Sequence, residues 1–235
     1  NLDALVNLKK LYLVNNKIKK IEGVNTLTKL TMLELGSNRI RVIENIDKLT
    51  NLTELWLGKN KIRSLQNLDT LVNLRLLSIQ SNRITSIGEG LKYNTNLQEL
   101  YLSHNGLQEM DEGLLHLPNL QTLDLAGNFI TKLANLQNAR QLKELWMNDN
   151  KVDSFDGLNC ITSSVIETIY LERNPVQSAD PQKYKQQILS AFPSLIQLDA
   201  LPIMSRIRAN RIESNIAYKM EEDHDTQKEQ QQQQK

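Results

Sequence analysis

Asparagine recurs along this chain at nearly constant intervals. No other feature of the sequence restricts the possible folds as strongly. Successive copies are 22, 22, 22, 23, 23, 22 and 24 residues apart. The eight copies are Asn16, Asn38, Asn60, Asn82, Asn105, Asn128, Asn150 and Asn174. Periods of this length are typical of solenoids, in which each repeat forms one coil and stacks on the next.

The residues around each asparagine follow the frame L-x-x-L-x-L-x-x-N-x-I. In the third copy they are Leu52, Leu55, Leu57, Asn60 and Ile62. Within L-x-L, a short strand turns its leucines inward and the residue between them outward. We therefore predict that the strands stack in parallel, and that the asparagines form a hydrogen-bonded ladder where the chain leaves each strand.

This frame is the leucine-rich repeat signature. The predicted fold class is α/β: a leucine-rich-repeat solenoid with a curved parallel sheet on the concave face and a C-terminal cap. Its convex segments are expected to be short helical, 3-10 or irregular. Each repeat supplies about six or seven aliphatic side chains, worth roughly 1.5–3 kcal/mol each on burial. Since no repeat can bury them alone, stability must come from stacking.

Four segments are expected along the chain. Residues 1–177 form eight repeats and are N-terminally incomplete, because Leu2, Leu5 and Leu8 look like the return half of an earlier coil. Residues 178–200 form a C-terminal cap, since Asp180–Pro181 signals a helix start. Residues 201–220 are expected to form a helical extension, with a weakly ordered segment as the alternative. Residues 221–235 are Gln-rich and charged, which predicts a disordered polar tail.

Composition excludes several classes of protein. The chain has 28 Lys and Arg against 27 Asp and Glu, whereas binders of nucleic acid or membrane surfaces show a basic excess. A single Cys160 excludes an intramolecular disulfide. No apolar run approaches the roughly 18 residues that a membrane span needs. Neither nucleic acid nor membrane is therefore an expected partner.

The sequence offers no catalytic constellation. His104, His116 and His224 lack Cys, Asp or Glu partners at metal-ligand spacing. Cys160 is interpreted as a small buried apolar residue rather than a nucleophile. The nine glycines are scattered and form no phosphate-binding loop. We predict a binding module and not an enzyme, with no catalytic residues, no metal and no cofactor.

The outward position at the centre of each strand is the best candidate for a binding surface, because the frame does not dictate it. Five of its eight residues are aromatic, although aromatics make up only 5% of the chain. The row reads Tyr12, Glu34, Trp56, Ser78, Tyr101, Asp124, Trp146 and Tyr170. Exposed Trp and Tyr are the residues most enriched in binding hot spots. This row is the predicted partner-binding stripe.

Charge narrows the kind of partner. Over the three outward positions of every strand, one base, Lys10, stands against six acids. The acids are Glu34, Glu54, Glu99, Asp124, Glu144 and Glu172. Such a surface favours a basic, partly apolar protein, for which Arg is the best-matched residue, and repels nucleic acid. The predicted partner-binding residues are Tyr12, Glu34, Trp56, Tyr101, Asp124, Glu144, Trp146 and Tyr170.

Longer stretches point to one family. The segments 144–150 (ELWMNDN) and 167–175 (ETIYLERNP), supported by 35–40 (LGSNRI) and 101–106 (YLSHNG), resemble the leucine-rich-repeat regulatory subunits of Ser/Thr protein phosphatase 1, of the regulatory-subunit-seven type. The resemblance covers about residues 1–200. It departs from the family in having fewer repeats upstream and in continuing through 200–235.

The resemblance implies a non-catalytic protein of nucleus and cytoplasm. Its concave face would hold the phosphatase catalytic subunit, with room in the complex for a further inhibitor subunit, and would modulate the activity or location of the enzyme. By resemblance, the contact residues are Tyr12, Glu34, Trp56, Asp124, Glu144, Trp146 and Tyr170. The alternative is another intracellular leucine-rich-repeat scaffold, such as a spliceosomal A-prime-like protein that binds an RNA-recognition protein.

Overall fold

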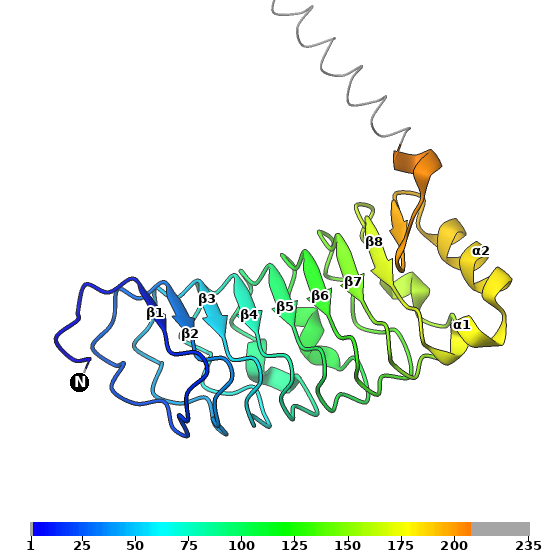
Figure 1. Ribbon diagram of the computed structural model, residues 1–235. Coiled ribbons are helices and arrows are strands. Elements are labelled where there is room, and N and C mark those ends of the chain that lie inside the picture. Colours follow the sequence, from blue (N-terminus) through cyan, green and yellow to red (C-terminus); the bar gives the residue numbers. More distant parts are fainter. Residues whose placement is uncertain (1, 208–235) are drawn as a thin grey trace, which may run out of the picture.

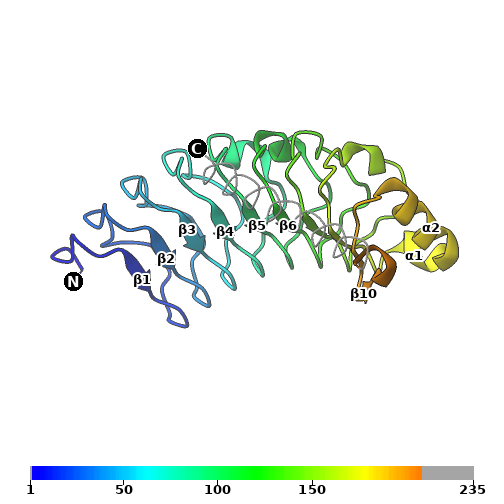
Figure 2. The same cartoon turned by 90° about the horizontal axis from the view of Figure 1, so that it is seen from above.

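The computed structural model of this protein describes residues 2–207, which wind into a curved solenoid (Figures 1 and 2). Each of the eight repeats contributes one three-residue strand, and we number the coils one to eight accordingly. The strands are β1 (Lys10–Tyr12), β2 (Met32–Glu34), β3 (Glu54–Trp56), β4 (Leu76–Ser78), β5 (Glu99–Tyr101), β6 (Thr122–Asp124), β7 (Glu144–Trp146) and β8 (Thr168–Tyr170). They pair in parallel and in chain order, which confirms the predicted fold class.

The strands form because alternate residues of the frame are apolar. In β2, Leu33 is fully buried while its two neighbours, on the outward face, are half-buried. Coil two also buries Leu27, Leu30, Leu35 and Ile40. Each such side chain contributes roughly 1.5–3 kcal/mol. The residues contributed by all coils form one continuous core along the axis of the solenoid.

The repeated asparagines from Asn38 to Asn174 form the predicted ladder, and each of these seven connects two coils. The Asn60 Oδ1 accepts the Ile40 N–H at 2.9 Å. Its Nδ2 donates to the carbonyls of Leu35, in the preceding coil, and Leu57, in its own, each at 3.0 Å. The same pattern recurs from Asn38 to Asn174. The side chains bond backbone groups rather than one another, because a turn leaves those groups without partners.

The residue before each of these asparagines adopts a left-handed backbone, a conformation that the repeat frame does not predict. The φ values are +55° at Ser37, +55° at Lys59 and +54° at His104. Glycine occupies the equivalent position only once, as Gly127. The turn itself therefore imposes this conformation, and the ladder of hydrogen bonds offsets its cost for non-glycine residues.

Three 3-10 helices lie on the return side of the coils, away from the strands (Figure 2). They are η1 (Gly88–Leu91), η2 (Glu112–His116) and η3 (Leu158–Cys160). The first two occupy the coils in which the repeat lengthens to 23 residues. The Asp111 carboxylate accepts the Gly113 N–H of η2 and the Ser86 hydroxyl of the preceding coil. The extra residue is thus absorbed without disturbing the strands.

The C-terminal end of the solenoid is covered by α1 (Pro175–Ala179) and α2 (Pro181–Ala191), followed by a hairpin of β9 (Gln197–Leu198) and β10 (Leu201–Pro202) (Figure 1). Strand β9 continues the parallel sheet beside β8, and β10 is antiparallel to it. In α2 the Asp180 carboxylate caps the Lys183 N–H. Tyr184 and Ile188 on the same helix are buried against coil eight.

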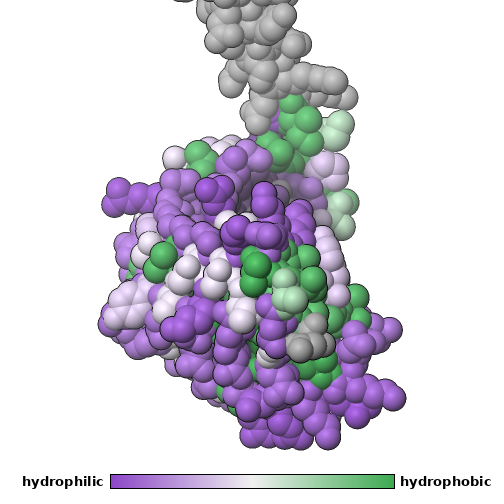
Figure 3. All heavy atoms as spheres, turned by 90° about the vertical axis from the view of Figure 1, so that its left-hand side faces the viewer, coloured by the Kyte–Doolittle hydropathy of each residue, from purple (hydrophilic) through white to green (hydrophobic). Residues whose placement is uncertain are grey.

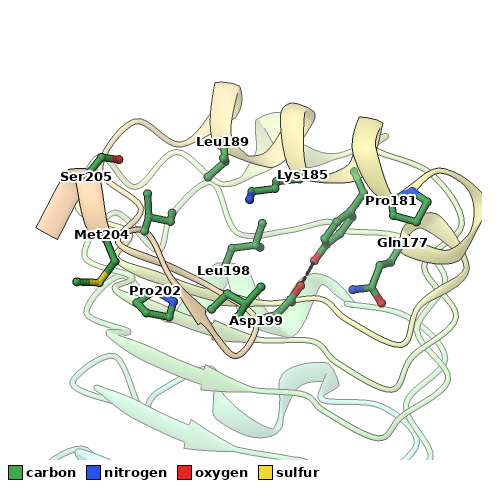
Figure 4. Close-up of a pocket in the computed structure, with 12 residues that line it drawn as sticks. Gln177, Pro181, Lys185, Leu189, Leu198, Asp199, Pro202, Met204 and Ser205 are labelled. Carbon is green, nitrogen blue, oxygen red and sulfur yellow. Dashed lines mark hydrogen bonds between the residues drawn. The ribbon is translucent and has the colours of Figure 1, made fainter.

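Asp199 holds this cap onto the last coil. Its buried carboxylate accepts the backbone N–H groups of Leu171 at 2.8 Å and Glu172 at 2.9 Å. It also accepts the Tyr184 hydroxyl, the bond that is dashed in Figure 4. The buried position and the neighbouring negative charge raise the pKa of Tyr184, so its hydroxyl remains a donor.

The segment after the cap is tied back to it. Residues 204–207 are helical. The Arg206 guanidinium donates to the carbonyls of Leu189, Phe192 and Leu195, at and just beyond the end of α2. A cation at a helix C-terminus satisfies carbonyls that have no partner within the helix. The remainder of the predicted 201–220 extension, and the predicted tail 221–235, lie outside the described residues.

The N-terminal end has a different surface. Leu5 is 46% exposed, whereas Leu27, its equivalent one coil later, is fully buried. The backbone bond from Leu8 N–H to the Leu5 carbonyl repeats the one from Leu30 N–H to the Leu27 carbonyl, so residues 2–8 have the shape of a return segment. Figure 3 views this end of the solenoid and shows hydrophobic residues bordered by hydrophilic ones.

Candidate protein-binding surface

The register of the sheet brings the predicted stripe into one row. Tyr12 pairs with Glu34, Glu34 with Trp56, and the pairing continues strand by strand to Tyr170. We call this row, together with the outward residues on either side of it, the concave surface. It lies on the inner side of the curve (Figure 2). Side chains from coils far apart in sequence therefore face one common space.

The members of the row differ in exposure. Tyr12 is 58% exposed, while Glu34, Trp56, Tyr101, Trp146 and Tyr170 are half-buried. Glu144, on the flanking position, is also half-buried. Ser78 and Asp124 are buried, at 1% and 7% exposure. These two side chains therefore expose little surface to a partner, and the assignment of Asp124 as a partner-binding residue stays a prediction.

Asp124 is buried, and its carboxylate forms a hydrogen bond with the backbone just after its own strand. It accepts the Ala126 N–H at 3.0 Å. Burial raises the pKa of Asp124, and its hydrogen bonds from the Ser103 hydroxyl and the Ala126 N–H oppose that shift, as does the nearby His104. Asp124 therefore stabilises the sheet between its larger neighbours in the row.

Three aromatic residues of the row touch one another, and we call them the aromatic cluster: Tyr101, Trp146 and Tyr170. The rings of Tyr101 and Trp146 meet edge to face with centroids 6.4 Å apart, across the intervening strand β6. Those of Trp146 and Tyr170 meet in the same way at 6.0 Å. Such contacts contribute about 0.5–1.5 kcal/mol each. The cluster is therefore a continuous, fixed apolar platform over β5–β8.

Polar contacts hold the rings in place. The Tyr101 hydroxyl donates to the Glu99 carboxylate at 2.7 Å, and the Tyr170 oxygen accepts a bond from the Gln197 side chain of β9. Burial, followed by the Glu99 hydrogen bond and the nearby carboxylates, raises the pKa of Tyr101. The Trp146 Nε1 is buried and has no partner among the described residues.

The repeat frame does not predict the hydrogen bond between Tyr101 and Glu99, but a signal for it exists in the sequence. In three strands a glutamate stands two residues before an aromatic residue, as in Glu54–Trp56, Glu99–Tyr101 and Glu144–Trp146. Residues two apart on a strand share a face. In β3 the Trp56 Nε1 donates to the Glu54 carboxylate at 3.3 Å. Gln197 could not be found in this way, because its role depends on how the cap folds back.

The acids make the concave surface negative. Glu34 accepts the Gly36 N–H at 3.1 Å and remains half-buried in the row. Glu172 pairs with Arg173, whose guanidinium also bonds both oxygens of Asp149, at 2.6 and 2.8 Å. The Arg173 hydrogen bond is the main reason that the pKa of Asp149 falls to about 2. Arg173 is thus neutralised by two acids and adds little positive field to the surface.

Outside the concave surface, few of the described residues are candidates for metal binding or catalysis. Within residues 2–207, no group of three or more His, Cys, Asp or Glu residues could hold a metal ion. Cys160 is half-buried rather than buried, and burial raises the pKa of its thiol, which disfavours the reactive thiolate. His224 lies outside the described residues. In the same part of the chain, no helix combines the length and apolarity needed to cross a bilayer.

The cap contains one apolar pocket, between α2 and the hairpin (Figure 4). Leu198 and Pro202 line it on the hairpin side, and Lys185 and Leu189 on the helix side. Lys185 brings the one cation of its lining and Asp199 the one carboxylate, and the latter already holds the cap together. Neither group is arranged with a second one for acid–base chemistry.

Fold and surface together define a solenoid repeat protein with an acidic, aromatic concave face. The family model described as "Leucine rich repeat" matches residues 72–130, and the one described as "Leucine Rich repeats (2 copies)" matches residues 6–45, 28–70 and 118–160. These matches cover most of the solenoid. The chain belongs to the leucine-rich repeat family.

Two curated relatives are phosphatase regulators. The chain is 48% identical over 71 residues to protein phosphatase 1 regulatory subunit pprA of Dictyostelium discoideum, covering 30% of this chain and 20% of that protein. It is 44% identical over 70 residues to protein phosphatase 1 regulatory subunit SDS22 of Schizosaccharomyces pombe, covering 29% and 21%. The match spans about a fifth of the length of either relative. These matches confirm the resemblance noted in the sequence.

Solved structures share the fold. Internalin C2 of Listeria monocytogenes is 28% identical with a TM-score of 0.65, covering 83% of this chain and 82% of that one. A leucine-rich repeat protein of Leptospira interrogans is 24% identical with a TM-score of 0.73, covering 87% and 59%. The similarity to these structures shows that the chain shares their solenoid fold.

Proposed function

We propose that this protein is a non-catalytic subunit that binds the catalytic subunit of protein phosphatase 1 through its concave surface and modulates its activity or location, in the nucleus and cytoplasm. The observation that carries the proposal is the row of aromatic and acidic side chains in register across β1–β8. Two relatives that bear the name of phosphatase 1 regulatory subunits support the choice of partner.

The physical roles divide between the two kinds of side chain. The aromatic cluster offers rigid apolar area, which costs little conformational entropy when a partner covers it. Glu34, Glu54 and Glu144 supply negative charge around that area and attract basic side chains of the partner. The protein contributes no chemistry; it occupies a face of the enzyme. A further inhibitor subunit is compatible with this arrangement and forms part of the proposal.

Calorimetric titration of the purified chain with the phosphatase catalytic subunit tests the proposal. Trp146→Ala should weaken binding by about 2 kcal/mol or more, because it removes the centre of the aromatic cluster. The matched control is Tyr93→Ala, an exposed aromatic outside the sheet. Equal affinity of both folded variants would contradict a concave binding site.

A second titration tests the charge of the surface. Glu34→Lys should lower the affinity, and the wild-type complex should weaken as salt rises. An affinity independent of salt would contradict an acidic recognition surface. Capture of an RNA-recognition protein from nuclear extract, with no phosphatase bound, would favour the other scaffold class instead.

A further inference from the structure

A second charged surface lies beside the concave one, where the chain has just left each strand. In coils one to four, the first and third residues after the repeated asparagine are basic at seven of eight positions, although Lys and Arg account for only 28 of the 235 residues. We call these residues the basic ridge: Lys17, Lys19, Arg39, Arg41, Lys61, Arg63 and Arg83.

Backbone hydrogen bonds hold the ridge residues in register. The N–H of Arg39 bonds the Ile18 carbonyl, and those of Lys61 and Arg83 bond the carbonyls of Ile40 and Ile62, each at 2.8 Å. Neighbouring coils of such a stack are about 5 Å apart, as strands in a sheet are. The side chains of Lys17, Arg39, Lys61 and Arg83 therefore start from one line along the edge of the solenoid.

The ridge cations are not neutralised within the described part of the chain. Six of the seven are exposed, and Lys61 is half-buried. The ion pairs among residues 2–207 involve Lys48, Lys92, His116 and Arg173, and none involves a ridge residue. Glu22 and Glu44, which follow on the same coils, form no ion pair with them. Like charges held this close repel one another, which a bound anion would relieve.

The repeat frame does not require these cations. In coils five to eight, the same positions hold one cation, Lys151, among uncharged residues and one acid. Those other residues are Gly106, Gln108, Phe129, Thr131, Asp153, Pro175 and Gln177. The ridge is therefore a property of the first half of this chain rather than of the coil.

We propose that the basic ridge binds an acidic polypeptide segment. An acidic helix presents carboxylates at intervals of about 5–6 Å along one face, close to the spacing of the coils. Single-stranded nucleic acid is less suited, because the ridge has no aromatic residue on which bases could stack. The acids of the adjacent concave surface also repel a phosphate backbone. The protein thus offers a negative inner face and a positive edge to two partners of opposite charge.

Fluorescence anisotropy with a labelled Glu-rich helical peptide tests the ridge. The wild-type chain should bind at low salt, with an affinity that falls as salt rises. Replacing Lys17, Arg39, Lys61 and Arg83 together by Glu should weaken binding about tenfold or more. The matched control replaces four exposed lysines outside the ridge, Lys132, Lys143, Lys151 and Lys183, by Glu, and should retain most of the affinity. Thermal melting checks that both variants fold.

Three outcomes would overturn the inference. The first is an absence of peptide binding at low salt, and the second is an equal loss in both variants, which would show only an effect of net charge. The third is ridge-dependent binding of oligo-dT or phosphatidylserine vesicles that is tighter than that of the peptide. The ridge variant should still bind the phosphatase catalytic subunit, so failure here and failure of the proposed function can be told apart.

Discussion

The two halves of the solenoid share one backbone but differ in their surfaces. Coils five to eight carry the aromatic cluster, in which Trp146 touches both Tyr101 and Tyr170. In coils one to four, Tyr12 and Trp56 are separated by Glu34 and are not among the contacting aromatic pairs of the described residues. The first half instead has the basic ridge at its edge. A repeat frame fixes where a side chain points, while the residue chosen there decides what the coil can bind.

The surfaces at the two ends of the solenoid also differ. The second half ends in a cap that provides a hydrogen-bond acceptor for backbone N–H groups of the last coil. The first half ends in exposed apolar side chains (Figure 3). We expect substitutions in the second half to cost more stability, because its cap and its aromatic cluster add contacts between coils that the first half does not show among the described residues. Four sets of substitutions test how much such contacts contribute in different parts of the solenoid.

The largest effect should come from Asp199→Ala in the cap. The substitution leaves the backbone N–H groups of Leu171 and Glu172 and the Tyr184 hydroxyl without an acceptor. The free energy of unfolding should fall by about 3 kcal/mol, measured by urea denaturation. Asp199→Asn keeps an acceptor oxygen and should cost less. A loss below about 1 kcal/mol in the alanine variant would show that the cap does not depend on Asp199.

The next-largest effect should appear when the two tryptophans are replaced and the losses in the free energy of unfolding are compared. Trp146→Ala removes two aromatic contacts and should lower the free energy of unfolding by about 2 kcal/mol. Trp56→Ala removes one side-chain hydrogen bond and should cost less than about 1 kcal/mol. Chemical denaturation of both variants measures the difference. Equal losses would mean that the cluster adds no stability to its half.

A third comparison uses the asparagine ladder. Asn82→Ala removes the acceptor of the Ile62 N–H and the donor to the Leu57 carbonyl, so stability should fall by about 1–2 kcal/mol. Asn16 is exposed and, among residues 2–207, bonds only Leu13 and Val14 of its own coil, so Asn16→Ala should cost less than about 0.5 kcal/mol. An unmoved melting midpoint in the Asn82 variant would argue against a stabilising ladder.

The smallest effect concerns the Asp149–Arg173 pair. Because the pKa of Asp149 is about 2, below its usual value of about 3.9, the pair stabilises the fold above about pH 4. That contribution is lost as the pH falls through about 2. The pair is exposed and screened by solvent, so Arg173→Gln should change stability only slightly. It should return the pKa of Asp149 toward its usual value in an NMR titration, and an unchanged pKa would rule out Arg173 as the cause.

Much of the site could be read from the sequence because its positions are set by a period. Tyr12, Trp56 and Trp146 occupy equivalent places in the frame, so their common row follows from counting alone. The contacts between side chains within the row could not be predicted from the period. Tyr101 and Trp146 meet across a strand because Asp124 between them is small and buried, and Gln197 reaches Tyr170 only because the cap folds back.

By itself, the sequence determined the coil, the parallel order of the strands, the ladder of asparagines and the face on which acids and aromatics gather. These depend on periodicity and on the alternation of side chains along a strand, which are local properties. The tertiary structure decided which acids stay free, which rings touch, and how Asp199 and Arg206 close the C-terminal end. Such outcomes depend on burial and on hydrogen bonds between segments brought together only when the coils stack.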